Sequence, residues 1–360
     1  MSASSLLDII RLRIENLGPL SIADYMSMCL SDPKHGYYAT GNPFGKDGDF
    51  ITAPEVSQLF GEIIGAWLVH QWVQDGKPAN ARLVELGPGR GTLMKDIMRV
   101  AKALPEFEQA VTLHMVETSP KLQNEQQKTL HGTRAHWHES FADVPEGPVY
   151  LIANELFDAL PVHQFVKTPN GWHERCVGLD ETGELSFGLG VSALDTAALP
   201  KQAQSAVEGS VLEVSPLASA LMEQIAQRIT KNGGAALVID YGYTKASVGE
   251  TFQAIRNHEF TSPLATPGQA DLTAHVNFPA LIAATRKGGA VAYGPISQAD
   301  FLLQLGLLER AGQLGAGKSQ AEQDEIRKAV ERLAADNQMG TLFKVLAIGQ
   351  SSSSPLPFPA

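Results

Sequence analysis

The fold is decided by residues 83–92, which read Leu83-Val84-Glu85-Leu86-Gly87-Pro88-Gly89-Arg90-Gly91-Thr92. A short apolar strand runs into a glycine-rich turn, and residues 93–104 have the pattern of a helix. Strand, glycine turn and helix in this order are typical of the ligand site of a doubly wound sheet, at the carboxyl ends of its strands. Glycine lets the backbone of such a turn approach a ligand closely. The stretch therefore predicts an α/β, Rossmann-like fold with a ligand site at the turn.

The spacing of the glycines discriminates between two classes of ligand. A dinucleotide site has the pattern G-x-G-x-x-G, with the pyrophosphate at the N-terminus of the following helix. Here the third glycine comes one place early, and Glu85 would bring a negative charge close to a pyrophosphate. S-adenosylmethionine has no phosphate and carries a sulfonium and an ammonium group, so an acid there is favourable. We therefore predict S-adenosylmethionine as the cofactor. Its predicted contacts in this stretch are Glu85, Gly87, Pro88, Gly89, Gly91 and Thr92. The alternative is a glycine-rich turn that binds no ligand.

The ends of two later strands extend the predicted cofactor site. Residues 113–117 end in Glu117, whose carboxylate can accept hydrogen bonds from both ribose hydroxyls. Ser140 and Phe141 follow the next strand, where a polar group and an aromatic surface suit the adenine. A place in the hydrophobic core is an equal alternative for Phe141.

The loop after the fourth strand, residues 154–161, faces the transferred methyl group in this fold and should hold the acceptor. Methyl transfer is an in-line displacement, so the enzyme must align the nucleophile and free its lone pair. Glu155 and Asp158 can supply a carboxylate pair for a guanidinium, and we predict that both are catalytic. Asn154 is expected to bind the substrate or the methionine end of the cofactor. Alternatively, Asp158 caps the next turn and Asn154 only ends the strand.

From Ala81 onward, short apolar strands alternate with amphipathic helices, which predicts a mostly parallel, doubly wound sheet. Alternating segments between Val162 and Leu189 are expected to form hairpins at the edge of that sheet, and 53–72 is expected to be one helix. The expected domains are an N-terminal helical segment over 1–80 that contributes to the site, a cofactor-binding core over 81–250, a mainly helical insertion or substrate region over 251–335, a closing strand over 336–350 and a disordered tail over 351–360.

The composition is that of an acidic globular protein. The chain has 360 residues and a formal net charge of -11, which argues against nucleic-acid binding and suits a basic partner such as an arginine-bearing protein. Its two cysteines are too few for a disulfide framework or a four-ligand zinc site. Neither a secretory signal nor an apolar run of the ~20 residues that a membrane span needs is recognisable. We expect a cytoplasmic protein without membrane insertion, and a homodimer remains open.

Several long motifs resemble the MidA family of class I methyltransferases over nearly the whole chain: residues 35–38, 48–62, 85–92, 154–161, 240–243 and 271–278. The resemblance implies a Rossmann-like fold with added N-terminal helices and an insertion. The family includes a mitochondrial complex I assembly factor that methylates arginine, so it also implies an arginine-bearing protein substrate, such as a subunit of a respiratory complex. A mitochondrial location does not carry over, because no presequence is visible. The paired-glutamate loop of better-known arginine methyltransferases is absent, and Glu155 and Asp158 are a partial equivalent.

The motifs add further site residues. Thr52, Pro54 and Glu55 begin a helix whose free N–H groups can face the carboxylate of the cofactor, an ordinary capped helix being the alternative. His275 is predicted to accept a proton from the substrate. The alternative is a structural role, which a lone histidine usually has. No metal is predicted, because the pair His136 and His138 has no acidic or cysteine partner at ligand spacing.

The leading hypothesis is therefore a protein arginine N-methyltransferase that uses S-adenosylmethionine. A methyltransferase for a small molecule or for another protein side chain is the first alternative. A non-enzymatic assembly factor that keeps the cofactor fold for binding is the second.

Overall fold

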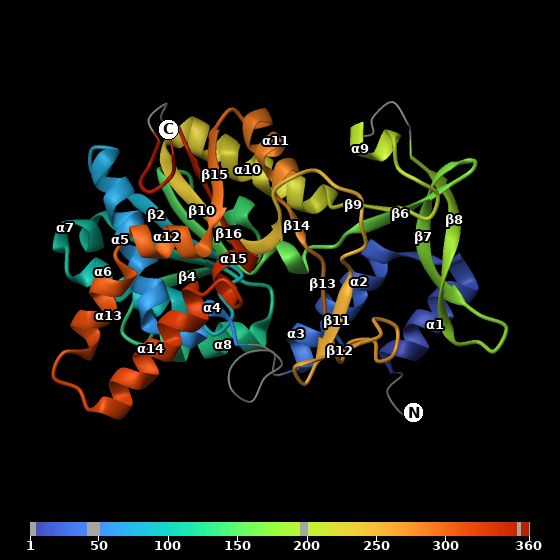
Figure 1. Cartoon of the computed structure of the whole chain (residues 1–360), viewed down its shortest axis with the longest axis horizontal. Coiled ribbons are helices and arrows are strands. Elements are labelled where there is room, and N and C mark those ends of the chain that lie inside the picture. The colour runs from blue at the N-terminus through green and yellow to red at the C-terminus, as the bar shows by residue number, and fades with distance from the viewer. Residues whose placement is uncertain (1–4, 42–50, 195–200, 351–353, 360) are drawn as a thin grey trace.

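The core of the structure is a mostly parallel sheet (Figure 1). The computed structural model describes residues 5–41, 51–194, 201–350 and 354–359. Residues 48–50, the start of the family motif at 48–62, therefore lie outside the described residues. The strand order is β15-β16-β10-β5-β2-β3-β4, and β16 runs antiparallel to both of its neighbours. The bounds are β2 (Ala81–Leu86), β3 (Val111–Val116), β4 (Ala135–His138), β5 (Val149–Asn154), β10 (Gly234–Tyr243), β15 (Val291–Ser297) and β16 (Phe343–Gly349).

Helices cover both faces of this sheet, which confirms the predicted Rossmann-like class (Figure 1). One face packs against α5 (Gln58–Gln74), α6 (Thr92–Lys102), α7 (Pro105–Ala110), α12 (Gln298–Gln304), α13 (Leu307–Gly315), α14 (Gln320–Ala334) and α15 (Met339–Leu342). The other face packs against α10 (Pro216–Asn232) and α11 (Phe278–Lys287). The helix α8 (Pro120–Thr129) links β3 to β4. Within the described ranges, no helix has the length and apolar character needed to cross a membrane.

A second half of the molecule contains the N-terminal helices and two smaller sheets (Figure 1). The helices α1 (Leu6–Leu17) and α2 (Ile22–Ser31) begin at capping serines, and their apolar faces pack against both sheets. One sheet contains β1 (Leu20–Ser21), β6 (His163–Thr168), β7 (Gly171–Leu179), β8 (Leu185–Ala193) and β9 (Val211–Val214), near the short α9 (Lys201–Gln204). The other contains β11 (Gln253–Arg256), β12 (Glu259–Thr261) and β13 (Asp271–Thr273).

The structure differs from the sequence expectations in three segments. The hairpins of residues 163–193 do not lie at the edge of the central sheet but form a separate sheet with β1. The region 251–335 is not mainly an insertion, because β15 belongs to the central sheet and β11 to β13 form a sheet of their own. The expected helix over 53–72 is interrupted at Ser57, whose extended backbone separates α4 (Ala53–Val56) from α5 and whose hydroxyl caps α5.

The expected disordered tail is also different where it is described. Within 354–359, Phe358 is buried, and its ring centroid lies 6.0 Å from that of Phe301 on α12. The Nε1 of Trp67 on α5 donates a hydrogen bond to the carbonyl of Leu356 at 2.6 Å. This short segment therefore covers the core on one face of the sheet. Residues 351–353 and 360 of the predicted tail lie outside the described residues.

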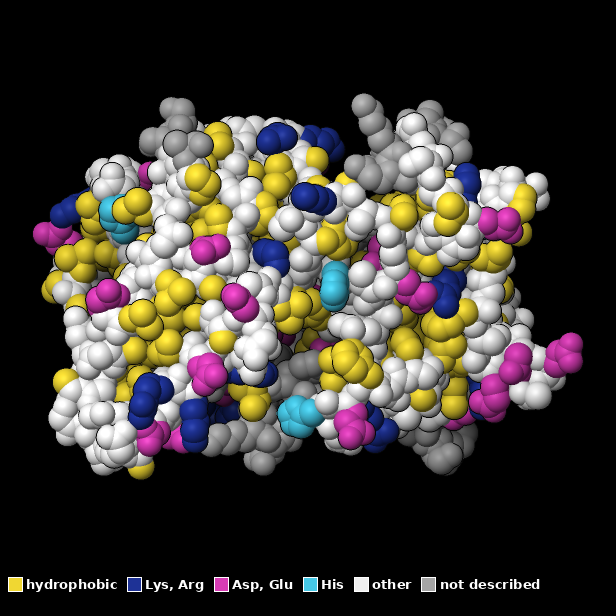
Figure 2. Space-filling model, in the orientation of Figure 1, with side chains coloured by type: hydrophobic (Ala, Val, Ile, Leu, Met, Phe, Trp, Pro, Cys, Tyr) yellow, Lys and Arg dark blue, Asp and Glu magenta, His cyan; other side chains and the backbone are white. Residues whose placement is uncertain are grey.

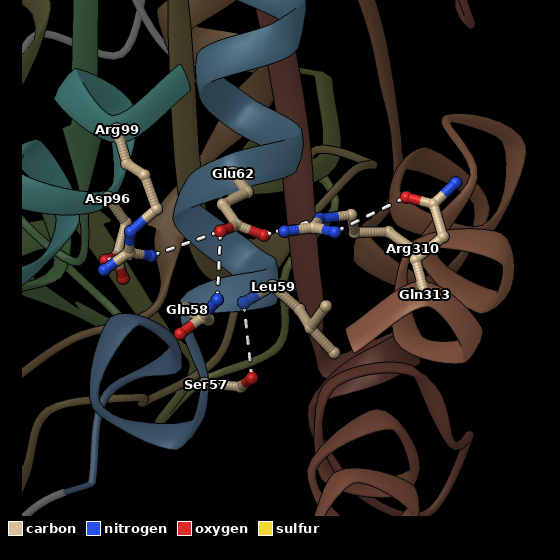
Figure 3. A network of polar contacts seen from close by, with 8 residues as sticks. All are labelled: Ser57, Gln58, Leu59, Glu62, Asp96, Arg99, Arg310 and Gln313. Carbon is tan, nitrogen blue, oxygen red and sulfur yellow. Dashed lines mark hydrogen bonds and ion pairs between the residues drawn. The ribbon is translucent and has the colours of Figure 1, made fainter. Parts of the chain in front are cut away.

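A buried carboxylate joins three helices on that face (Figure 3). Glu62 of α5 is 4% exposed and accepts hydrogen bonds from Arg99 of α6 at 3.2 Å and from Arg310 of α13 at 2.8 Å. The side chain of Gln58 donates to the same carboxylate at 3.0 Å. Because α5 precedes the glycine turn and α13 belongs to the C-terminal helices, this network links distant parts of the chain.

Replacing Glu62 by alanine should lower the free energy of unfolding, because Arg310 loses its buried partner and Arg99 is left with Asp96, at 2.9 Å. Both arginines are partly exposed, so we expect a loss of about 1–3 kcal/mol rather than the full cost of an unpaired buried charge. Urea unfolding followed by circular dichroism measures it. The control is Lys328→Ala, which removes an ion pair between side chains that are about 70% exposed and should change little. Equal effects of the two substitutions would contradict the role assigned to Glu62.

Candidate functional site

A pocket opens at the carboxyl ends of β2 and β5, between the glycine turn and α4. Its volume is about 410 Å³. The predicted site residues that line it come from three separate segments: Thr52, Pro54, Glu55, Glu85, Gly87, Pro88, Gly89, Thr92, Asn154 and Glu155. Arg90 and Leu93 also line it, although the sequence analysis did not select them. The ten predicted residues are thus brought together at one sheet edge.

The glycine turn has a backbone that requires glycine. Gly87, Gly89 and Gly91 have φ angles of 62°, 50° and 79°, in the left-handed region that side chains disfavour. A Cβ atom on Gly87 would lie 2.8 Å from a methyl carbon of Leu156. Gly91 does not line the pocket; it is the residue before α6 and lies against Gln126. Gly87 is therefore needed for packing as well as for the shape of the turn, whereas Gly91 is needed for its backbone conformation.

The pocket wall presents buried acceptor atoms that have no partner. Glu85 is 3% exposed, and its Oε2 has no hydrogen bond within the described residues. Burial raises the pKa of Glu85 well above its ordinary value, and the nearby Glu117 adds to the rise. The Oδ1 of Asn154 is also buried and finds no partner in the described ranges of the chain. Unpaired buried acceptors are costly, so this wall suits a ligand that brings donors and positive charge, as the ammonium and sulfonium of S-adenosylmethionine do.

Glu155 connects this pocket to the N-terminal segment. Its Oε1 accepts hydrogen bonds from the backbone N–H of Ala53 at 3.2 Å and from Nδ2 of Asn154 at 3.0 Å. Glu155 has a φ angle of 51°, which is rare for a residue with a side chain. The sequence analysis expected the first N–H group of α4 to be free to face a cofactor carboxylate. Instead, that N–H donates to Glu155. Glu55, by contrast, holds the hydroxyl of Thr92 at 2.6 Å.

An acidic cluster lies beside the pocket at the ends of β5 and β10. Asp240 is completely buried and accepts the N–H groups of Phe157, Asp158 and Tyr241 at 2.9, 3.2 and 2.9 Å. The hydroxyl of Tyr241 hydrogen-bonds to the carboxylate of Asp158. The Oδ1 of Asp158 is buried and has no partner in the described part of the chain.

The carboxyl groups of this cluster hold their protons more tightly than isolated acids. Burial raises the pKa of Glu155 to about 7, with Asp158 adding to the rise. Burial also raises the pKa of Asp158, and it raises that of Asp240 with the help of Asp158 and Glu155. Tyr38 lies at the same place, and its hydroxyl donates to Asp271 at 3.3 Å. The cluster is therefore an acidic, partly protonated region beside the cofactor pocket.

Glu117 is held by a glutamine that the sequence analysis missed. Gln126 of α8 is completely buried and donates from Nε2 to the carbonyl of Gly89 at 2.8 Å and to Glu117 at 3.1 Å. Its Oε1 accepts from Nε1 of Trp137 at 2.8 Å. Glu117 also accepts the N–H of Ser119 at 2.8 Å. Gln126 therefore fixes the predicted ribose ligand relative to the glycine turn.

Besides Gly91, Glu117 and Asp158, which lie beside the cofactor pocket, three further predicted residues do not line it. Ser140 is exposed and caps the short turn that begins at Phe141. Phe141 is buried in the core, with the guanidinium of Arg228 5.1 Å from its ring centroid, so its core alternative fits better than an adenine contact. His275 lines a different pocket, and its ring packs edge-on against Tyr241 at 5.5 Å. Within the described residues, no group of three or more ligating side chains is arranged to hold a metal ion.

Comparisons with known proteins agree with this geometry. Residues 63–296 match a family model described as S-adenosyl-L-methionine-dependent methyltransferase. The chain is 38% identical to the Drosophila melanogaster protein named protein arginine methyltransferase NDUFAF7 homolog, mitochondrial, over 94% of this chain and 83% of that protein. It is 35% identical to the Homo sapiens protein arginine methyltransferase NDUFAF7, mitochondrial, over 93% of this chain and 81% of that protein. These matches confirm the family resemblance that the motifs indicated.

A solved structure supports the predicted cofactor. A crystal structure from Burkholderia thailandensis, with S-adenosyl-homocysteine bound, has a TM-score of 0.83 and 28% identity to this chain. The match covers 98% of this chain and 93% of that one. The prediction of S-adenosylmethionine, made from the glycine turn, is thereby confirmed. The predicted cytoplasmic location is wrong, because the relatives that match over most of the chain are named mitochondrial.

Replacing Gln126 by leucine should weaken cofactor binding without touching the pocket itself. The change removes the hydrogen bonds that tie Glu117 to the glycine turn and leaves the indole N–H of Trp137 unpaired. We expect the Kd for S-adenosyl-homocysteine to rise about tenfold, a loss typical of one or two buried hydrogen bonds. Calorimetric titration measures it. The matched control is the exposed neighbour Gln127→Leu on the same helix, whose Kd should equal that of the parent protein.

Proposed function

The chain belongs to this family of S-adenosyl-L-methionine-dependent methyltransferases, and we propose that it N-methylates arginine on a protein substrate. The observation that carries the proposal is the acidic cluster beside the cofactor pocket. Within the described residues, no lysine or arginine forms an ion pair with Glu155, Asp158 or Asp240. Buried carboxylates without a cationic partner suit a guanidinium, which is always charged and offers several donors.

The proposed roles of Asp158 and Glu155 follow from their positions and from which of their atoms lack a hydrogen-bond partner among the described residues. When bound, S-adenosylmethionine supplies an electrophilic methyl group. The unpaired Oδ1 of Asp158 is the atom that holds the guanidinium and takes the proton that the attacking nitrogen must lose. Tyr241 fixes the carboxylate of Asp158, and Asp240 fixes its backbone. Glu155 lies on the wall of the cofactor pocket and orients the same guanidinium from the cofactor side.

The surface around the site favours a protein over a small molecule as substrate. Figure 2 shows that this face is hollowed near its middle, between the two halves of Figure 1, and that acidic, basic and histidine side chains lie around the hollow. An open surface can admit a protein segment, and the net charge of -11 attracts a basic one. The names of the relatives support arginine as the acceptor. A subunit of a respiratory complex, which the sequence resemblance implies, is the first protein to test.

Transfer of a radiolabelled methyl group tests this function directly. The chain is incubated with labelled S-adenosylmethionine and purified respiratory-complex subunits, and the labelled residue is identified by amino-acid analysis. We expect label in arginine. Label only in another residue or in a small molecule would support the other methyltransferase hypothesis. Cofactor binding without any transfer, together with undiminished partner assembly by a Gly87→Val variant, would support the assembly-factor hypothesis.

Activity should depend on pH through the acidic cluster. Because the pKa of Glu155 is raised to about 7 and that of Asp158 is also raised, both carboxyls become protonated as the pH falls, and a protonated carboxyl cannot pair with a guanidinium. We expect kcat/KM to be constant above about pH 8 and to fall about tenfold per pH unit below about pH 7.

Asp158→Asn should lower kcat/KM about 100-fold at pH 8, because the amide cannot accept the proton, and it should leave cofactor binding unchanged. The exposed Asp336→Asn is the control. A flat pH profile between 6 and 8 in the parent protein would contradict these roles.

A further inference from the structure

A second pocket lies next to the loop that carries Asp158. Its volume is about 490 Å³, and its lining includes Phe157, Val162, Ala218, His275, Asn277 and Leu281. Among the described residues, none lines both this pocket and the cofactor pocket. It is formed where β9, β10 and β14 (Val276–Asn277) meet the first turns of α10 and α11. Neither the proposed chemistry nor the cofactor uses it.

Direct contacts connect this second pocket to the acidic cluster. Phe157 lines the pocket, and the next residue is Asp158; the carboxylate of Asp240 holds the N–H groups of both. The N–H of Ala274, which also lines the pocket, donates to the carbonyl of Asp158 at 3.0 Å. The ring of His275 packs against Tyr241, whose hydroxyl holds the carboxylate of Asp158. The second pocket therefore begins one residue away from the group that is proposed to hold the arginine.

The polar groups of the second pocket are already satisfied or neutral. Glu213 accepts hydrogen bonds from Gln164 and from the backbone N–H groups of Thr251 and Phe252, at 2.8, 2.9 and 3.1 Å. The two helix starts are capped by Ser215 and Asn277, which accept the N–H groups of Ala218 and Ala280.

Two titratable side chains of this pocket, His275 and Tyr243, are uncharged near neutral pH, and the carboxylate of Glu213 is engaged by the hydrogen bonds just described. Burial lowers the pKa of His275 and raises that of Tyr243 to about 12. What remains available to a ligand is the apolar surface of Phe157, Val162 and Leu281, together with small side chains. Pockets of this kind select by apolar burial rather than by charge.

We propose that the second pocket is a specificity subsite that binds an uncharged, apolar side chain of the protein substrate, close in sequence to the methylated arginine. The inference rests on the proposed function. It requires the substrate to combine two chemistries: a guanidinium that enters the acidic cluster, and a leucine-sized apolar side chain a few residues away. The acidic cluster selects arginine as the methylated residue type. The second pocket selects which arginine of the substrate is methylated, according to its neighbouring side chain.

The test uses the full chain, labelled S-adenosylmethionine and a library of peptides with one fixed arginine. Each position within four residues of the arginine is set in turn to Leu, Gly, Glu or Lys. For the parent protein, we expect leucine at one fixed distance to raise kcat/KM about tenfold over glycine, as burial of a leucine-sized side chain does. Ala280→Phe fills the pocket from the first turn of α11 and should reduce this ratio to near one. The matched control is Ala283→Phe on the exposed side of the same helix, which should keep the ratio.

A second variant protects the test against misfolding of the first. Ser219→Leu narrows the pocket from α10 and should likewise reduce the preference for leucine over glycine at that same peptide position. Calorimetric titration with S-adenosyl-homocysteine shows whether each variant keeps its cofactor site. The subsite is refuted if arginine peptides are methylated without any preference for flanking residues, or if the preference for leucine survives both variants. Failure of every arginine peptide, with the cofactor bound normally, would instead refute the proposed function and the subsite with it.

Discussion

The candidate acceptor site depends on the carboxylate of Asp240. This side chain is completely buried, and a buried carboxylate is costly unless donors compensate it. Here the donors are backbone N–H groups, two from the loop after the neighbouring strand β5 and one from Tyr241. These hydrogen bonds therefore fix the loop after β5 and at the same time stabilise the buried carboxylate of Asp240. Asp158 and Phe157, held by the same oxygen, serve two different regions: the acidic cluster and the second pocket.

Several features around this contact lower the stability of the folded protein. Glu155 has a left-handed backbone, which costs about 1 kcal/mol or more for a residue with a side chain. Buried acceptor atoms of Glu85, Asn154 and Asp158 lack partners among the described residues, and each such atom costs about 1–3 kcal/mol. These costs fall at one sheet edge, where ligands with donors and positive charge would relieve them. The rigid parallel sheet beneath supplies the stability that such a site requires.

The parallel strands and the glycine turn could be predicted because each is a continuous signal in the sequence. β15 could not, since Gly294-Pro295 and a change of register interrupt it. Alternation predicted the hairpins of 163–193, but a period of two does not tell which sheet they join. Gln126 gave no signal, because a buried glutamine in a polar helix resembles an exposed one. The sequence left the core and the adenine as equal alternatives for Phe141, because a residue type next to a strand end does not fix the direction of its side chain.

The position of β16 has a consequence for how the chain folds during synthesis. β16, residues 343–349, lies between β10 and β15, and both of those neighbours leave the ribosome before it. Until it inserts, the sheet has a vacant place one strand wide, bounded by the unpaired backbone groups of β10 and β15. Open edges of this kind attract foreign strands. Synthesis of residues 343–349 is therefore the step that allows both of these edges to close.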